Sequence, residues 1–379
     1  MSAAPDKAME PIRIRSDYVG AGDYLIFPDD DPLVVNTDYG LQAVDLASRQ
    51  RWQADFGERC LGVCRRADGM LVASTIHGVF LVEPAGRVRH VNPTLHEIAH
   101  APLAWQDGVL VITLSHVHAL DAAGKVRWKY AFKETLGASV RACLVLGAFL
   151  VPGGVVLGVV DYNSGLGRVL CLDDRGGLRS ASDVGPITYV FPVGADAYVH
   201  SISGYGRFES RCIDLDGRER WALDFGGAGT ELPDGRIAML VGNNESPTWD
   251  NWELRLLTAG GGALGARKAS GHFGYGPVLG ADRQLYMAGF FKPFDPAATR
   301  LDYTSLVPLP KFVIFDHLLG VKAQPPQYVV FYHRAPIDDG DIELVFADRN
   351  AIAFGPTRAG TRHVYFTHNR EILAMPLRA

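Results

Sequence analysis

The sequence predicts an all-β fold, a single β-propeller of seven or eight four-stranded blades, with eight favoured. Three observations indicate this fold. A short motif recurs along the chain at a spacing close to the roughly 40–50 residues of one propeller blade. The 42 glycines and 22 prolines are scattered over the whole chain, as expected where many turns join short elements. No apolar pattern with helical periodicity competes with this reading.

The recurring motif is an apolar strand that ends in an acidic residue, followed by a turn and a basic or aromatic strand. Two regular copies are VHALDAAGKVRW (Val117 to Trp128) and RCIDLDGRERW (Arg211 to Trp221). Six copies are anchored, in order, at Asp45, Glu83, Asp121, Asp173, Asp214 and Thr258. Neighbouring anchors are therefore 38, 38, 52, 41 and 44 residues apart.

Each position of the motif has a physical role. The acidic side chain can accept hydrogen bonds from the exposed N–H groups of the turn that follows it. A glycine occupies the turn position where φ is positive and a side chain would clash. These glycines are Gly86, Gly124, Gly176 and Gly217. The aromatic residue at the end of the motif, as at Trp52, Trp128 and Trp221, is expected to cover the blade edge and seal it against the next blade.

The unit apolar-Asp-x-x-Gly-x-x-x-Trp is complete at Asp121 to Trp128 and at Asp214 to Trp221, and it resembles the repeat of PQQ-like (quinoprotein-like) propellers. The resemblance extends from about Asp23 to Trp252. That family contains dehydrogenases and non-catalytic scaffolds, so the fold alone does not determine the function. Its dehydrogenases commonly carry two adjacent cysteines and calcium ligands, and this sequence has no adjacent cysteine pair. The resemblance implies a non-catalytic member with no catalytic, cofactor-binding or metal-binding residues and no cofactor.

The termini are expected to close the ring. Residues 1–10 are predicted to be a flexible N-terminus and residues 11–379 a single propeller domain. Ile12 to Arg15 alternates apolar and basic residues, as expected of a strand, and can pair with the C-terminal unit. Such pairing would remove the free sheet edges. The seventh unit is assigned to residues 276–333, and the eighth begins with the segment NAIAFGP at Asn350.

Composition limits the classes of partner. The net charge is −5 and the isoelectric point about 6.2, so neither nucleic acid nor an anionic membrane is an expected partner. The first 15 residues contain no apolar run of a signal peptide. Five cysteines form no CxxC pattern, which favours reduced thiols in the cytoplasm.

Histidines provide two candidate metal patterns. His96-Glu97-Ile98-Ala99-His100 is a literal HExxH, but Pro93 and Pro102 bracket it, and the zinc-protease chemistry of this pattern requires a helix. We therefore expect a structural segment near the innermost strand of a blade. His116 and His118 have strand spacing, and a metal there would need further ligands. Tyr39-Gly40, His77-Gly78 and His116-Val117 occupy the same position in three units, which favours a structural role for that position.

Two segments interrupt the repeat, near 243–252 and 290–310. Their polar and aromatic character predicts loops that bind another protein, a basic one given the acidic chain. The candidate contact residues are Trp249, Asp250, Trp252, Phe290, Phe291, Phe294 and Tyr303. The predicted function is a non-enzymatic protein-binding propeller, such as a bacterial immunity or antitoxin-like partner. The alternatives are a quinone- or metal-dependent oxidoreductase and a hydrolase or lyase that uses the central funnel.

Overall fold

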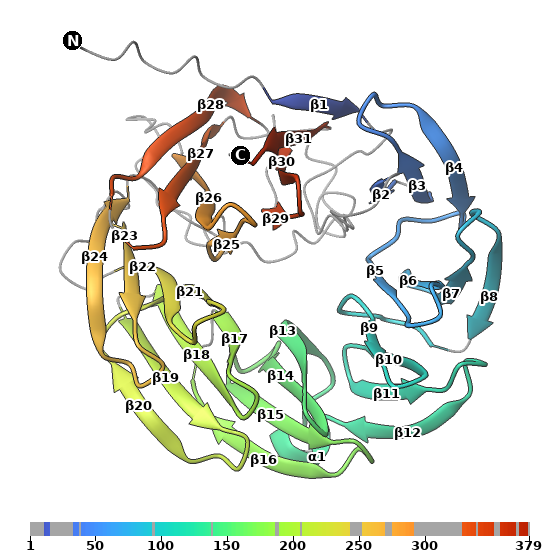
Figure 1. Cartoon of the computed structure of the whole chain (residues 1–379). Helices are drawn as coiled ribbons and strands as arrows, with labels where there is room; N and C mark the ends of the chain where they lie inside the picture. Colours follow the sequence, from blue (N-terminus) through green and yellow to red (C-terminus); the bar gives the residue numbers. More distant parts are fainter. Residues whose placement is uncertain are drawn as a thin grey trace, which may run out of the picture.

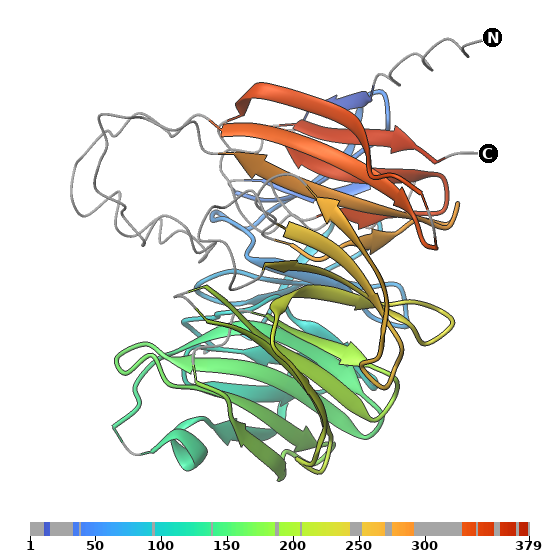
Figure 2. The same ribbon diagram turned by 90° about the vertical axis from the view of Figure 1, so that its left-hand side faces the viewer.

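Eight antiparallel sheets are arranged in a ring (Figure 1). This computed structural model describes residues 11–15, 33–37, 39–92, 95–137, 139–185, 189–204, 207–242, 252–269, 275–291, 328–338, 340–351, 357–368 and 371–377. Seen edge-on in Figure 2, the ring is a disc, and the short helix α1 (Lys133–Leu136) projects from its left-hand side. Within the described residues no helix is long and apolar enough to cross a membrane.

The sheets are numbered as blades 1 to 8 along the chain. Blade 1 has three described strands, β2 (Leu33–Asn36), β3 (Gly40–Val44) and β4 (Gln50–Asp55), which are equivalent to the second, third and fourth strands of the other blades. Blade 2 contains β5 (Gly62–Arg65), β6 (Leu71–Ser74), β7 (Val79–Val82) and β8 (Val88–Asn92). Blade 3 contains β9 (Leu103–Trp105), β10 (Gly108–Ile112), β11 (His116–Leu120) and β12 (Val126–Ala131). Blade 4 contains β13 (Cys143–Val151), β14 (Gly154–Asp161), β15 (Gly167–Asp173) and β16 (Leu178–Asp183).

The second half of the ring repeats the order. Blade 5 contains β17 (Tyr189–Val193), β18 (Ala197–Gly204), β19 (Arg207–Asp214) and β20 (Glu219–Leu223). Blade 6 contains β21 (Gly226–Glu231), β22 (Ile237–Gly242), β23 (Trp252–Leu257) and β24 (Ala263–Ala269). Blade 7 contains β25 (Val278–Leu279), β26 (Gln284–Phe291), β27 (Tyr328–Pro336) and β28 (Glu343–Ala351). Blade 8 contains β29 (Arg358–Ala359), β30 (His363–His368), β31 (Glu371–Pro376) and β1 (Ile12–Arg15).

The ring closes as the sequence predicts. β1 pairs antiparallel with β31, with Ile12 opposite Ala374 and Arg15 opposite Glu371. The N-terminal strand is thus the outermost strand of the C-terminal blade. The blade count of eight is confirmed, whereas the boundary placed between the last two blades is wrong. Residues 343–351 form the outermost strand of blade 7, because the 292–327 segment inside that blade moves its third and fourth strands along the sequence.

The core lies between the blades and not within any one of them. The buried apolar residues of the described chain form eight clusters, each of which joins two neighbouring blades. The cluster that joins blades 8 and 1 contains Ile14 of β1 together with Val35 and Tyr365. Since each blade packs on two neighbours, removing one blade would expose two apolar faces.

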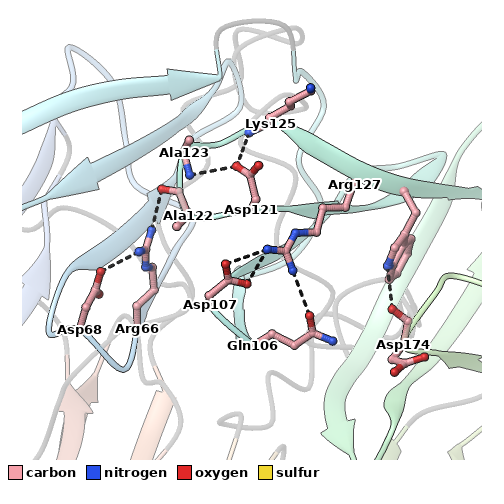
Figure 3. Close-up of polar contacts among 11 residues, drawn as sticks. Arg66, Asp68, Gln106, Asp107, Asp121, Ala122, Ala123, Lys125, Arg127 and Asp174 are labelled. Carbon is pink, nitrogen blue, oxygen red and sulfur yellow. Dashed lines mark hydrogen bonds and ion pairs between the residues drawn. The ribbon is translucent and has the colours of Figure 1, made fainter.

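The acidic residue of the motif caps the turn between the third and fourth strands, as expected. Asp121 Oδ1 accepts hydrogen bonds from the backbone N–H groups of Ala123 and Lys125, both at 2.9 Å (Figure 3). The same pair of contacts occurs at Asp45, Asp173 and Asp214. These bonds hold the Asp121 carboxylate in its charged form and lower its pKa.

The motif tryptophan packs on the turn of the following blade. Trp128 Nε1 donates to the carbonyl oxygen of Asp174 at 3.1 Å. A Cβ on Gly176, whose φ is +82°, would lie 2.5 Å from the Trp128 ring. Trp221 makes the same contacts with the carbonyl oxygen of Ala259 and with Gly261. The glycine is therefore required both by its positive φ and by the tryptophan that covers it.

Arginines make further links between these turns. Arg66 of blade 2 donates to the carbonyl oxygen of Ala122 in blade 3 at 3.0 Å (Figure 3). Arg179 pairs with Asp216 of the next blade at 2.8 Å. On this rim, called the Asp-turn rim, the turns between first and second strands and between third and fourth strands therefore connect blade to blade.

Candidate functional site

The opposite rim carries the turns between second and third strands and the connections between blades. We call it the α1 rim, since α1 lies in the connection between blades 3 and 4. Its described turn residues are 37 and 39, 75–78, 113–115 and 162–166. β22 and β26 end at this rim, and β23 and β27 begin at it; residues 243–251 and 292–327, which separate these strands in the sequence, lie outside the described residues.

Each of three of these turns contains its own buried threonine, whose backbone and hydroxyl group make the hydrogen bonds of the turn. Thr75 N–H donates to the carbonyl oxygen of Gly78 at 3.0 Å, and the Thr75 hydroxyl oxygen accepts from the N–H of His77 at 3.2 Å. Thr37 and Thr113 make the equivalent contacts. The threonine shared by the three turns was not among the residues singled out from the sequence. The recurring position was misaligned in blade 3, because the Thr113 N–H donates to the carbonyl oxygen of His116, which makes His116 equivalent to Gly40 and Gly78 and not to Tyr39 and His77.

The HExxH segment is not helical. Ile98 forms an isolated bridge with Thr113, and Glu97 has a φ of +59°. Glu97 N–H donates to the carbonyl oxygen of Ile76, and the Leu114 N–H donates to the Glu97 carbonyl oxygen, both at 2.9 Å. The segment therefore ties the turns of blades 2 and 3 together, and the geometry of a helical zinc site is not formed.

His116 and His118 lie on one face of β11, with ring centroids 5.5 Å apart. Burial, with the charges of His116 and Lys129, lowers the pKa of His118 to about 4, and burial also lowers the pKa of His116. Both rings are neutral at pH 7. Within the described part of the chain, no group of three or more histidine, cysteine, aspartate or glutamate side chains could hold a metal ion.

Large apolar side chains are exposed on four turn positions of the α1 rim. The exposed fractions are 63% for Tyr39, 45% for Ile76, 50% for Tyr162 and 63% for Leu166. Tyr162 and Leu166 flank one turn, in which the buried Asp161 accepts from the N–H groups of Asn163 and Ser164. The sequence singled out Tyr39 only for a structural role, and it did not single out Ile76, Tyr162 and Leu166, because their short turns resemble ordinary connections.

The structure places three of the seven candidate contact residues in strands. Trp252 begins β23 and is only 5% exposed, so its assignment to a loop is wrong; it packs in the core between blades 6 and 7. Phe290 and Phe291 end β26 and pair with Val330 and Val329, so they too belong to the sheet. Trp249, Asp250, Phe294 and Tyr303 lie outside the described residues.

The comparisons with known proteins agree with this fold. No protein-family model and no curated protein matches the sequence. Among solved structures, an inactive variant of virginiamycin B lyase from Staphylococcus aureus has a TM-score of 0.51 at 10% identity, over 84% of this chain and 95% of the lyase. BamB from Moraxella catarrhalis has a TM-score of 0.44 at 17% identity, over 75% of this chain and 96% of BamB.

The WD40 domain of Pan2 from Neurospora crassa has a TM-score of 0.46 at 8% identity, over 84% of this chain and 90% of that domain. This chain is a β-propeller. Identities this low establish the fold alone, and the activities of these propellers are not transferred to this one.

Proposed function

We propose that this propeller is a non-enzymatic protein of the PQQ-like class that binds another protein through its α1 rim. The Asp-capped turn and the tryptophan that covers the glycine of the next blade support the PQQ-like assignment. A cytoplasmic location is part of the proposal. None of the five cysteines forms a disulfide, and burial raises the pKa values of their thiols, as suits a reducing compartment.

The observation that carries the proposal is the exposure of Tyr39, Ile76, Tyr162 and Leu166 on the α1 rim. Large apolar side chains on well-ordered turns are typical anchors of protein interfaces. They are presented by turns whose backbone is fixed through Thr75 and Asp161, so little conformational entropy would be lost on binding. The acidic net charge favours a basic partner.

The test is affinity capture of partners from the native host, with identification by mass spectrometry. It compares the wild-type protein with two double variants whose substituted side chains are exposed to a similar extent. The first, Tyr162→Ser with Leu166→Ser, removes anchors from the α1 rim. The control, Leu178→Ser with Leu264→Ser, changes residues that are 45% and 52% exposed at the starts of outer strands.

We expect the control to retain one specific partner and the first variant to lose it, with at least a tenfold fall in affinity, about 1.4 kcal/mol. Equal loss in both variants, or retention in both, would contradict binding through the α1 rim.

A further inference from the structure

Three connections meet at the corner of blade 2 on the α1 rim. Glu58 comes from the connection that precedes the blade, His77 from the turn between its second and third strands, and His96 from the connection that follows it. The rings of His77 and His96 lie edge to face with centroids 6.2 Å apart. Glu58 Oε2 lies 3.9 Å from Nε2 of His77. We call these three side chains the blade-2 corner.

The corner is held in place by buried groups. The hydroxyl of Thr75, which is fully buried, donates to Glu58 Oε1 at 2.5 Å. Leu95 and Ile98 are buried on either side of His96, and the Glu97 backbone bonds both neighbouring turns. His77 and His96 are exposed at the surface while their backbone is fixed. The geometry is therefore prepared before any ligand arrives.

One carboxylate oxygen is left available. Glu58 Oε1 is occupied by Thr75, and among the described residues no donor lies within hydrogen-bonding distance of Oε2. The distance of 3.9 Å to His77 Nε2 is too long for a direct hydrogen bond. A donor nitrogen placed about 2.8 Å from both atoms would subtend an angle of about 90° with them. That angle is within about 20° of the angle between two N–H bonds of an ammonium group, so both hydrogen bonds can form with modest bending.

An arginine fits this arrangement poorly. Its planar guanidinium pairs best with both oxygens of one carboxylate, and here Thr75 occupies one of them. A lysine carries three donors on a compact head and an aliphatic stem. The side chain of Ile76, 45% exposed beside His77, provides an apolar surface for that stem.

We propose that the blade-2 corner binds a lysine side chain of a partner protein, with Glu58 Oε2 and His77 Nε2 accepting from the ammonium group and Ile76 in contact with its stem. This inference deepens the function proposed above, because it states which chemistry the partner must present at one point of the α1 rim.

The test uses short capped peptides, Ac-Gly-Leu-Lys-Leu-Gly-NH₂ and its counterparts with arginine or acetyl-lysine in the central position. They are titrated into the full chain at about pH 8 while the imidazole signals of His77 and His96 are followed by NMR. We expect saturable shifts with the lysine peptide, weaker binding of the arginine peptide and none of the acetyl-lysine peptide.

Glu58→Gln is the deciding variant, since a glutamine oxygen can still accept from Thr75. It should weaken binding of the lysine peptide about tenfold without changing the melting temperature. Glu134→Gln, an exposed glutamate of α1, is the matched control and should bind like wild type. Equal binding of the arginine or acetyl-lysine peptide, or unchanged affinity in Glu58→Gln, would overturn the proposal. So would micromolar binding of Zn²⁺ that depends on Glu58, because the corner would then be a metal site.

The two proposals can fail separately. If partner capture requires Tyr162 and Leu166 but is unaffected by Glu58→Gln, the lysine site is wrong and the α1 rim remains the interface. If the lysine peptide binds as expected but no partner depends on Tyr162 and Leu166, the lysine site stands and the protein-binding function fails.

Discussion

The two rims of the propeller differ in how regularly the hydrogen bonds of their turns repeat. On the Asp-turn rim, four turns repeat the same pair of hydrogen bonds to an aspartate. Tryptophan or arginine side chains join three of them, the turns of Asp121, Asp173 and Asp214, to a neighbouring blade. Among the described turns of the α1 rim, those of blades 1 to 3 share a threonine pattern and that of blade 4 is capped by Asp161, and the tips of these turns expose different side chains. The difference indicates that one rim maintains the ring and that the other is free to vary, which suits a binding surface.

The largest expected effect lies on the Asp-turn rim. Trp128→Ala should lower the free energy of unfolding by about 3–5 kcal/mol, since it removes a large aromatic side chain from between two blades. Urea titration followed by far-UV circular dichroism measures it. A loss no greater than that of Tyr162→Ala would mean that the two rims do not differ as described.

A second effect concerns the sheets between the rims. His200 of β18 is 1% exposed, and burial lowers its pKa to about 4 from 6.5. Between these values the unfolded chain binds a proton and the folded chain does not, so stability is present above pH 6.5 and falls as the pH drops toward 4. His200→Leu should reduce the stability difference between about pH 7 and about pH 4.5 by about 2–3 kcal/mol. An unchanged difference in parallel urea titrations would contradict the lowered pKa.

The glycine under Trp128 provides a coupled test. Gly176→Ala should cost about 2 kcal/mol, from its positive φ and from the clash with the ring. In the Trp128→Ala background the clash is gone, so the same change should cost about 1 kcal/mol. Additive costs in the double-mutant cycle would show that the tryptophan does not depend on this glycine.

The cap of the turn should matter less. Asp121→Ala leaves the N–H groups of Ala123 and Lys125 without their acceptor and should cost about 1–2 kcal/mol. Asp121→Asn keeps an acceptor oxygen and should cost less than half as much. If the two variants are equally stable in thermal denaturation, the carboxylate is not the cap.

The smallest effect is expected at the tips of the α1 rim. Tyr162→Ser with Leu166→Ser should change the free energy of unfolding by less than about 0.5 kcal/mol, because both side chains are exposed. A drop of several degrees in the melting temperature would mean that these residues support the fold. Loss of the partner in this variant would then reflect unfolding and not removal of a contact surface.

The fold could be predicted from the sequence because the turns of the Asp-turn rim repeat one motif. Four turns could be aligned because in each one an aspartate caps the turn before an outer strand; these aspartates are Asp45, Asp121, Asp173 and Asp214. Ile12 to Arg15 was assigned to the closing blade by its alternation. The blade 7 boundary was misplaced because the repeat is not maintained across a long insertion.

The candidate site was less accessible to the same reasoning. Trp252 was assigned to a loop because polar residues precede it, but its burial depends on contacts with blade 7, about 30 residues further along the chain. Glu58, His77 and His96 come together only because three connections share one rim. No local sequence pattern predicts that these three residues are neighbours, because their positions depend on how the strands of blade 2 are arranged between them.

The closure by β1 has a consequence for the order of folding during synthesis. The first described strand of the chain leaves the ribosome before any of the seven sheets that follow it, and its partner β31 leaves after all of them. The seam between blades 8 and 1 is thus the contact of highest sequence separation, and its loop-closure entropy is paid last. Until then the nascent propeller is an open arc with two apolar end faces, and exposed apolar surface of this kind favours aggregation.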